Sequence, residues 1–255
     1  MTVLGVSGAT GQMGGAVIET AAEREDVEVA FGIDADTGPD VGGPLYEPSA
    51  APDAIADHDP DAIVDFSVPE ATVDLARECA SVGVPLVVGT TGFEDDGSAI
   101  LHETSEAIPL LKATNFSRGI QALLRALGPA VDALPGYDVE VTETHHNRKR
   151  DAPSGTAKTL LAEIDERRDF GTVYGRKGIQ PREEGEVGVH VRRAGDIRGE
   201  HEVVIAGNDE VLTLSHRAED RGVFAAGAID AAIWLVGSEP GWYGFGDVVG
   251  EPTDR

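Results

Sequence analysis

The chain has 255 residues, and its 46 acidic against 20 basic side chains give a formal net charge of −26. Such a charge repels phosphate backbones and anionic membrane surfaces, which argues against nucleic acid or a membrane as partners. Because the chain has a lone Cys79, no Cys/His zinc spacing and no apolar run of bilayer length, we expect a cytoplasmic protein without a structural metal.

The first half of the chain alternates short β-rich runs with helical patterns. Strands are predicted at residues 2–7, 27–33, 62–67, 85–91 and 109–115, and the clearest helices at residues 12–23 and 70–82. Strands that alternate with amphipathic helices predict an α/β fold with a doubly wound parallel sheet of the Rossmann type. The helices are then its right-handed crossovers.

A different pattern begins after Asn115. A helix is predicted at 117–134, a strand at 138–146, a further helix from about Ser154, and strands at 187–195, 199–207 and 210–219. The short connections between these last three strands predict antiparallel neighbours. The apolar stretch 223–236 predicts a closing helix that packs back on the first domain. We therefore predict a dinucleotide-binding domain of residues 1–114 and 222–255, and an α+β domain of residues 115–221.

A glycine-rich turn lies between the first strand and the first helix. Gly8, Gly11 and Gly14 have the spacing GxxGxxG, and glycines at this point permit a tight turn and a close approach of a pyrophosphate. The helix start adds backbone N–H groups and a partial positive charge for the phosphates. The pattern indicates a dinucleotide site, and the alternative is a glycine-rich turn that binds no ligand.

Asp34 ends the second strand about 20 residues after the glycines, where an acidic side chain can accept hydrogen bonds from both hydroxyls of the adenosine ribose. The next residue, Ala35, offers no guanidinium to a 2′-phosphate, and Asp34 repels one. The pair predicts NADH as the preferred cofactor, with NADPH as the second choice. The alternative for Asp34 is a solvated acid at a strand end.

Two later strands are predicted to end in small and hydroxyl-bearing residues, namely 89–91 and 113–116. Ligands of open α/β sheets bind at the carboxyl ends of the strands. We therefore expect these residues beside a nicotinamide ring and its carboxamide. Residues 65–67 have a similar position, but for them a turn that merely ends the strand is an equal alternative.

Residues 143–156 concentrate cations within this acidic chain. His145, His146, Lys149 and two arginines all fall within residues 145–150, which predicts an electropositive pocket that attracts carboxylates. The alternative is a basic surface loop that binds sulfate or pairs with acidic neighbours. A metal site on the two histidines is disfavoured, because adjacent strand residues point to opposite faces.

A helix start follows the cationic run. Pro153 and Ser154 are favoured at such a start, so the N–H groups of Gly155 and Thr156 are expected to face an anion. A dicarboxylate would then be held by His146 at one end and by the helix start at the other. Reduction of a conjugated double bond also needs a proton donor beside the carbon that accepts the hydride, and the candidates are Lys149 and His145.

This segment resembles the signature HHxxKxDAPSGT of the dihydrodipicolinate reductases, which is matched here by His145, His146, Lys149 and residues 151–156. The resemblance continues in chain order through residues 8–14, 65–67, 89–93, 115–117 and 193–201. It implies that the cyclic product of dihydrodipicolinate synthase, 4-hydroxy-tetrahydrodipicolinate, is reduced to tetrahydrodipicolinate in the diaminopimelate and lysine pathway. It also implies a second domain for substrate binding and oligomerisation, and a homotetramer in which the sheets of these domains meet.

By position, the resemblance implies roles for individual residues. His145 matches the family's proton donor or acceptor and Lys149 its proton donor, while His146, Gly155 and Thr156 match its substrate contacts. The implied cofactor contacts are Gly8, Ala9, Thr10, Gly11, Gln12, Met13, Asp34, Gly89, Thr90, Thr91, Ala113, Thr114, Asn115 and Phe116.

Two positions depart from the family pattern. Members that use both cofactors often carry Arg where this chain has Ala35, and the usual Ala-Asn-Phe-Ser begins with Thr114 here. The competing enzyme class is another two-domain NAD(P)-dependent dehydrogenase of a small dicarboxylate. Its semialdehyde type is rejected because Cys79 lies in a predicted helix, away from the strand ends. The non-enzymatic alternative is a nucleotide-sensing protein, which the intact segment 145–156 disfavours.

The acidic side chains are dispersed between apolar positions rather than gathered in one run, and only four lysines occur, Lys112, Lys149, Lys158 and Lys177. This composition predicts a surface adapted to high salt. The alternatives are an ordinary acidic protein and a disordered acidic tail.

Overall fold

The computed structural model describes residues 1–36 and 41–250, and the chain divides into two compact units. Unit 1 comprises residues 1–116 and 221–255, and unit 2 comprises residues 117–220. These boundaries differ from the predicted ones by two residues at the first crossing and by one residue at the second. The binding roles that we assigned to the two domains stay predictions.

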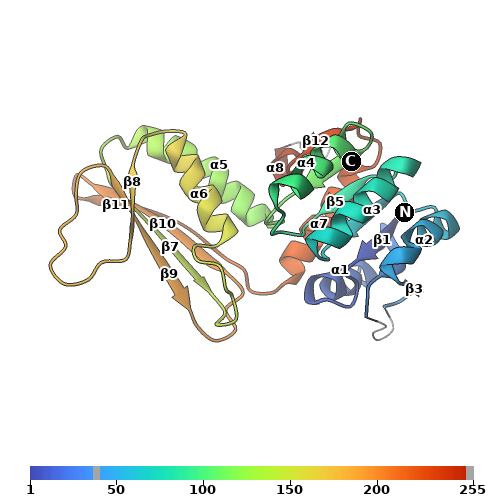
Figure 1. The fold of residues 1–255 in the computed structure, drawn as a ribbon. Helices are drawn as coiled ribbons and strands as arrows, with labels where there is room; N and C mark the ends of the chain where they lie inside the picture. Colours follow the sequence, from blue (N-terminus) through green and yellow to red (C-terminus); the bar gives the residue numbers. More distant parts are fainter. Residues whose placement is uncertain (37–40, 251–255) are drawn as a thin grey trace. The chain divides into compact units, whose positions relative to one another are not determined.

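Unit 1 contains a seven-stranded sheet in the order β12-β6-β5-β4-β1-β2-β3 (Figure 1). All neighbouring strands are parallel. The order reverses between β1 and β4, as in doubly wound sheets that bind ligands at the carboxyl ends of their strands. The strands are β1 (Thr2–Ser7), β2 (Val27–Ile33), β3 (Leu45–Tyr46), β4 (Ala62–Asp65), β5 (Leu86–Val88), β6 (Pro109–Lys112) and β12 (Gly241–Tyr243).

Helices cover both faces of this sheet. Leu4 and Val6 of β1 share one core with the buried alanines of α7, whereas Phe31 of β2 shares a second core with Leu75 of α3. The helix α7 packs against α1 and against β4, β5 and β6, which confirms the predicted closing helix. The helices of unit 1 are α1 (Gln12–Ala22), η1 (Pro48–Ala50), α2 (Ala51–His58), α3 (Pro69–Val82), α4 (Asp95–Ser105), α7 (Gly222–Leu235) and α8 (Phe245–Gly250).

Three strands of unit 1 are shorter than predicted. β4, β5 and β6 end at Asp65, Val88 and Lys112, so residues 66–67, 89–91 and 113–115 lie in the loops beyond the strands. In one of these loops the backbone N–H of Gly89 donates to the carbonyl oxygen of Asp65 at 2.8 Å. This bond continues the parallel pairing of β4 with β5 by one residue, so the loop after β5 begins beside the end of β4.

Unit 2 contains a five-stranded sheet in the order β11-β10-β7-β9-β8. Apolar side chains of α5 and α6 pack on Val139, Val187 and Val203 of this sheet, and burial of each such side chain contributes about 1.5–3 kcal/mol. The elements are α5 (Arg118–Ala133), β7 (Asp138–His145), α6 (Gly155–Asp165), β8 (Gly171–Tyr174), β9 (Glu186–Arg193), β10 (Glu200–Gly207) and β11 (Glu210–Arg217).

The prediction that the last three strands are antiparallel neighbours was wrong for β9 and β10. β7 lies between them, antiparallel to β10 and parallel to β9. Residues 194–199 can cross over β7 because strands two places apart are only about 10 Å apart, a span that a few extended residues cover. The crossing is held by the N–H of Ala194, which donates to the carbonyl oxygen of His145 at 2.9 Å.

Within the part of the chain that the structure describes, no helix combines the length and the apolar character that a membrane span requires.

Candidate active site

The glycine-rich turn joins β1 to α1. Gly8 has a φ of +73°, and a side chain there would overlap the backbone of Phe66. A side chain on Gly14 would overlap the carbonyl group of Gly8. Both positions therefore require glycine. Because α1 begins directly after Gly11, which supplies no side-chain cap, the backbone N–H groups of its first turn are available to an anion.

Two neighbours of this turn refine the predicted contacts. Ala9 is 1% exposed and belongs to the core of unit 1. The side-chain oxygen of Gln12 accepts a hydrogen bond from Arg221 at 2.8 Å. Arg221 therefore places a cation beside the turn, a feature that sequence spacing did not reveal because the two residues are far apart along the chain.

Asp34 lies directly after β2 and is bound to the glycine-rich turn. Its Oδ2 accepts hydrogen bonds from the backbone N–H and the hydroxyl of Thr10, at 2.9 and 2.7 Å, and its Oδ1 accepts one from the N–H of Asp36 at 3.2 Å. Burial alone would raise the pKa of Asp34, but the hydrogen bonds from Thr10 outweigh it and lower the pKa. Oδ2 of the ionised carboxylate already accepts two hydrogen bonds, so Oδ1 is the better acceptor for a ribose hydroxyl.

A cavity of about 490 Å³ lies at the carboxyl ends of β1, β2 and β4. Its lining includes Asp34 and Ala35 on one side and Arg77 of α3 on another. The Arg77 guanidinium is paired with Asp74 at 3.2 Å, and both side chains are exposed. A guanidinium thus reaches this cavity from α3 even though Ala35 provides none.

Asp65 is fully buried at the end of β4. Its carboxylate accepts hydrogen bonds from the hydroxyls of Ser67, Thr72 and Thr90, each at 2.6 Å. Because Thr90 belongs to the loop after β5, Asp65 fixes a predicted cofactor contact. This residue therefore does more than end a strand.

The loop after β6 combines core and surface residues. Phe116 is 2% exposed, and its ring contacts those of Phe66 and Phe245 with centroids 5.7 and 5.4 Å apart. The side chain of Phe116 thus belongs to the core, and its backbone oxygen packs against Gly227 of α7. Thr114 is exposed, while the N–H of Ala113 donates to the carbonyl oxygen of Val88.

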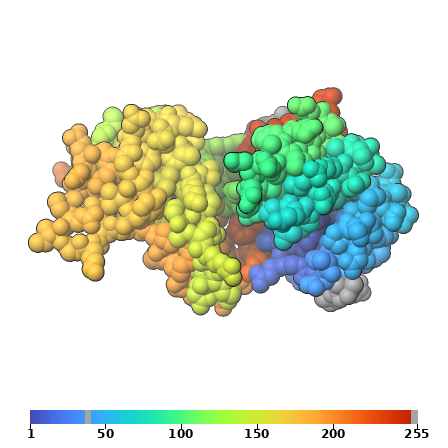
Figure 2. Space-filling model, in the orientation of Figure 1, coloured from blue at the N-terminus to red at the C-terminus, as the bar shows by residue number. Residues whose placement is uncertain are grey.

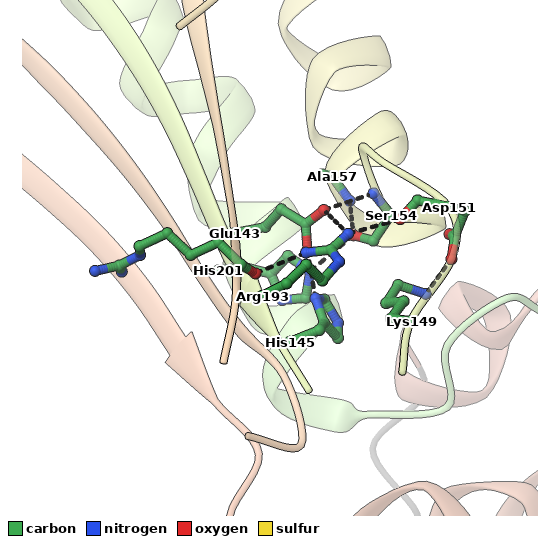
Figure 3. Close-up of polar contacts among 9 residues, drawn as sticks. Glu143, His145, Lys149, Asp151, Ser154, Ala157, Arg193 and His201 are labelled. Carbon is green, nitrogen blue, oxygen red and sulfur yellow. Dashed lines mark hydrogen bonds and ion pairs between the residues drawn. The ribbon is translucent and has the colours of Figure 1, made fainter. Parts of the chain in front are cut away.

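In unit 2 the central strand β7 ends at His145, and the buried carboxylate of Glu143 binds this histidine (Figure 3). The Nδ1 of His145 lies within hydrogen-bond distance of Oε2 of Glu143. The guanidinium of Arg193 donates to both oxygens, at 3.2 and 2.9 Å, and the N–H of Ser154 donates to Oε1 at 2.9 Å. Burial would raise the pKa of Glu143, but the hydrogen bonds from His145 and Arg193 outweigh it and lower the pKa to about 2.

Arg193 also anchors the loop that carries Lys149. Its guanidinium donates to the backbone oxygen of Asp151 at 2.6 Å. The ammonium of Lys149 lies 2.9 Å from the Asp151 carboxylate and is turned toward it in Figure 3. Burial would raise the pKa of Asp151, but the hydrogen bond from Lys149 outweighs it and lowers the pKa. Lys149 is therefore held by an ionised carboxylate and is mostly shielded from solvent.

His201 of β10 packs against His145, with ring centroids 5.2 Å apart and planes at 73°. Its Nε2 lies 3.2 Å from the hydroxyl of Ser154. Burial, and then the charge of His145, lower the pKa of His201 to about 4. His201 is consequently neutral near pH 7. It adds no positive charge beside His145.

The start of α6 agrees with the sequence prediction. The helix begins at Gly155, and the hydroxyl of Ser154 caps it by accepting a hydrogen bond from the N–H of Ala157 at 3.2 Å. Gly155 and Thr156 therefore occupy the first turn, where backbone N–H groups have no carbonyl partner within the helix. His146 follows β7 and is half-buried.

Glu143, His145 and His201 also bring potential metal ligands within 4.8 Å of one another. We interpret them as a hydrogen-bonded cluster, because the Arg193 guanidinium contacts the same carboxylate and would repel a metal cation. Sequence reasoning placed no role on Glu143, Arg193 or His201. The family resemblance includes Arg193 and His201 without giving them a role, and it does not include Glu143. No local pattern shows these three residues, because their contacts join three different strands.

Comparison with known proteins places the whole chain in one family. Residues 2–116 match the family model described as "Dihydrodipicolinate reductase, N-terminus", and residues 119–249 match the one described as "Dihydrodipicolinate reductase, C-terminus". The 4-hydroxy-tetrahydrodipicolinate reductase of Haloarcula marismortui is 60% identical over 98% of this chain and 99% of its own length. That of Natronomonas pharaonis is 53% identical over 96% of this chain and 98% of its own length. Both organisms are halophiles.

A solved structure shows the same fold. The dipicolinate-bound dihydrodipicolinate reductase from Paenisporosarcina sp. TG-14 superposes with a TM-score of 0.80 at 22% identity, over 97% of this chain and 99% of the other. The family and the Rossmann-type fold of unit 1 indicate binding of NAD(H) or NADP(H). Family matches across both units, with relatives at 60% and 53% identity, show that this chain belongs to the dihydrodipicolinate reductase family of oxidoreductases.

Proposed function

We propose that the protein reduces 4-hydroxy-tetrahydrodipicolinate to tetrahydrodipicolinate in the diaminopimelate route to lysine, with NADH as its preferred cofactor. The observation that carries the proposal is the cationic segment 145–156. It combines His145, Lys149 and the start of α6 around the buried pair of Glu143 and Arg193. Relatives at 60% and 53% identity bear the name of this reductase.

The reaction divides into a hydride and a proton transfer. Loss of the ring hydroxyl as water leaves a conjugated double bond, to which a hydride adds at one carbon and a proton at the neighbouring carbon. Lys149 is the proton donor in this proposal, and His145 accepts or returns a proton. Asp151 supports the role of Lys149, because it holds the ammonium group at 2.9 Å. A positioned general acid typically accelerates such a step by about 10²–10⁴-fold.

The two carboxylates of the substrate need separate partners. We assign one carboxylate to His146 and the other to the backbone N–H groups of Gly155 and Thr156. The N-terminus of α6 favours an anion because its aligned backbone N–H groups give it a partial positive charge. The Ser154 cap supports this assignment, since it starts the helix directly before these two residues.

We assign the cofactor to unit 1, where the tight turn at Gly8 leads from the carboxyl end of β1 directly to the start of α1. The bound cofactor supplies the hydride. The proposed contacts in the turn and after β2 are Gly8, Ala9, Thr10, Gly11, Gln12, Met13 and Asp34, and those after β5 and β6 are Gly89, Thr90, Thr91, Ala113, Thr114, Asn115 and Phe116.

The preference for NADH rests on the ionised Asp34. Its carboxylate suits a ribose hydroxyl and repels a 2′-phosphate, while Ala35 adds no compensating charge. Arg77 works in the opposite direction, because its guanidinium lines the same cavity. We therefore expect a moderate preference of about tenfold in the ratio of KM values.

A coupled assay tests the function. Pyruvate, aspartate semialdehyde and a dihydrodipicolinate synthase supply the substrate, and absorbance at the NADH band follows oxidation with and without this protein. Oxidation that requires both the synthase and this protein is the expected result. If oxidation never exceeds the rate without this protein, the proposed function is wrong.

We further propose a homotetramer built through the sheet of unit 2. Val211 and Leu212 of the edge strand β11 are 66% and 36% exposed, and Ile179 of the β8–β9 connection is fully exposed. Figure 2 shows this gold-coloured connection at the surface of unit 2. Apolar side chains in such exposed positions are typical of surfaces that pair with another chain. Light scattering coupled to size exclusion gives the oligomeric state, and a monomer at micromolar concentration would contradict the proposal.

Adaptation to high salt and a cytoplasmic location complete the proposal. A net charge of −26 makes the surface repel itself when screening is weak. Activity and melting temperature should therefore rise with KCl, and full stability in salt-free buffer would contradict the salt adaptation. The free and buried Cys79 agrees with a reducing compartment.

A further inference from the structure

We propose that Glu143 is a positioning residue that fixes the tautomer of His145, so that Nδ1 carries the proton and Nε2 is the nitrogen that meets the substrate. The inference rests on the proposed function, in which His145 transfers a proton. It goes further by naming the nitrogen that reacts and the residue that selects it.

The hydrogen bonds of Glu143 carry the first step. Arg193 and the backbone N–H of Ser154 can only donate, and they contact both oxygens of the carboxylate. The carboxylate is fully buried and ionised, so each of its oxygens can only accept. The contact with Nδ1 of His145 is therefore favourable only when Nδ1 carries a proton. In the neutral ring, the lone pair then lies on Nε2.

The surroundings of Nε2 carry the second step. A side chain placed on Gly199 would come within 3.1 Å of this nitrogen. Because Gly199 has no side chain, this crowded contact with Nε2 is absent. Nε2 is the ring nitrogen that Glu143 does not contact, and we assign it to the substrate.

The other titratable and charged groups near His145 are paired or neutral, so Glu143 is the group that orients the ring. Arg193 of β9 neutralises the carboxylate in a two-oxygen ion pair, Lys149 and Asp151 of the following loop neutralise each other, and His201 of β10 is neutral. His216 faces the far side of His201, and burial lowers the pKa of His216. When Nε2 accepts a proton, the ionised Glu143 stabilises the imidazolium through the Nδ1 hydrogen bond. The same proton can then be returned from Nε2.

The proton on His145 can be located directly. We would label the histidine side chains of the full-length protein with ¹⁵N and assign His145 by comparison with a His145→Gln sample. Long-range ¹H–¹⁵N spectra at about pH 8, above the usual titration range of histidine, distinguish a protonated Nδ1 from a protonated Nε2. The expected result for the unmodified protein is a protonated Nδ1. A protonated Nε2 overturns the proposal, whether or not the enzyme is active.

Glu143→Gln tests the causal role. The amide replaces one acceptor by a donor, and because Arg193 and Ser154 can only donate, the NH₂ group is best accommodated opposite His145. The proton of His145 should then move to Nε2. Outer-shell partners of reacting groups typically contribute about 10–100-fold, so kcat should fall by about 10²-fold with a much smaller change in KM. An unchanged tautomer or an unchanged kcat in a folded Glu143→Gln protein would rule out the positioning role.

Two further variants separate positioning from charge removal or misfolding. Glu140→Gln removes the same charge from the same strand, where Glu140 accepts hydrogen bonds from Arg182 and His190. It should leave the tautomer of His145 and kcat unchanged. If Glu143→Gln does not fold, Glu143→Asp takes its place. This variant keeps a carboxylate with a shorter reach, so it should retain the Nδ1 proton and have a kcat below that of the unmodified protein. A protonated Nε2 in Glu143→Asp at normal kcat would overturn the proposal.

The same samples distinguish failure of this inference from failure of the proposed function. If the spectra show the expected tautomer but the protein is inactive in the coupled assay, the proposed function is wrong and the positioning of His145 by Glu143 still holds. If the protein is fully active but Nε2 of His145 is protonated, the positioning role is wrong and the proposed function still holds.

Discussion

The glycine-rich turn of unit 1 and the Glu143 cluster of unit 2 supply polar groups in two different ways. In the turn, backbone N–H groups at the start of α1 face outward because Gly8 and Gly14 allow a tight bend. In the cluster, side chains of β7, β9 and β10 meet, and Glu143 binds both His145 and Arg193. The turn depends on glycines that carry no side chain, whereas the cluster depends on the identity of each side chain in it.

This difference predicts different sensitivities. Removing one partner of a buried ion pair leaves the other charge without compensation, which commonly costs about 3–5 kcal/mol. Glu143 and Arg193 form such a pair. The turn of unit 1 should instead tolerate many side-chain changes at its non-glycine positions, and should fail where a side chain is added to a glycine.

The largest expected effect is on catalysis in unit 2. Lys149→Ala removes the proposed proton donor and should lower kcat by about 10²-fold or more, the usual scale for a lost general acid. Steady-state kinetics in the coupled assay measure this. Lys158→Ala is the matched control, because Lys158 lies on α6 just after this segment and is exposed, so its loss should leave kcat unchanged. Near-normal turnover of Lys149→Ala would remove Lys149 from the mechanism.

The second effect concerns the pH dependence of stability in unit 2. The folded pKa of His201 is about 4 and its ordinary value is 6.5, so between these values the unfolded chain binds a proton that the folded chain does not. His201 therefore weakens the fold as the pH falls through this window. Between about pH 7 and 4.5 the unmodified protein should lose about 2 kcal/mol more than His201→Asn.

Urea unfolding of both proteins at the two pH values, in the same salt, gives these free energies of unfolding. Glu143 affects stability at lower pH than His201. Its folded pKa is about 2 against an ordinary 4.5, so its contribution to stability is lost only as the pH falls through the range between these values. Parallel pH dependences of the unmodified protein and His201→Asn would contradict a neutral, buried His201.

A comparable effect is expected in the turn of unit 1. Gly8→Ala adds a side chain at a φ of +73° and against the backbone of Phe66, which should cost about 2 kcal/mol and weaken NADH binding. Gly83→Ala is the matched control, because Gly83 has a φ of +79° with no atom within 4 Å of the added carbon. It should cost about 1 kcal/mol or less, with NADH affinity unchanged. Equal effects of the two variants on unfolding and on NADH titration would mean that the overlap at Gly8 has no consequence.

The smallest expected effect is on cofactor choice. Ala35→Arg places a guanidinium beside Asp34 that can fork onto a 2′-phosphate, and it should narrow a preference for NADH of about tenfold. Arg77→Ala should widen that preference if the guanidinium lining the cavity already attracts the phosphate. Initial rates with both cofactors at fixed substrate decide the matter. An equal or lower KM for NADPH in the unmodified protein would show that our interpretation of Asp34 and Ala35 is wrong.

The features that the sequence determined by itself are local ones. The alternation of strands and helices in unit 1, the start of α6 after Ser154 and the glycine-rich turn all follow from periodic burial and from the conformational limits of a few neighbouring residues. Patterns of this kind are complete within one segment. The strands β3, β8 and β12 were not predicted. All three lie at sheet edges and lack the continuous burial that makes β4, β5 and β6 read as apolar runs.

Only the tertiary structure decided which distant groups meet. The sequence showed a cationic run at residues 145–150, but not that Arg193 would bind a carboxylate 50 positions earlier, nor that β7 would separate β9 from β10. Strand order and buried ion pairs are settled by the packing of whole layers, which brings together residues that share no local pattern. The ionised state of Glu143 and the neutral state of His201 arise in the same way, since burial and partners, rather than residue type, determine their pKa values.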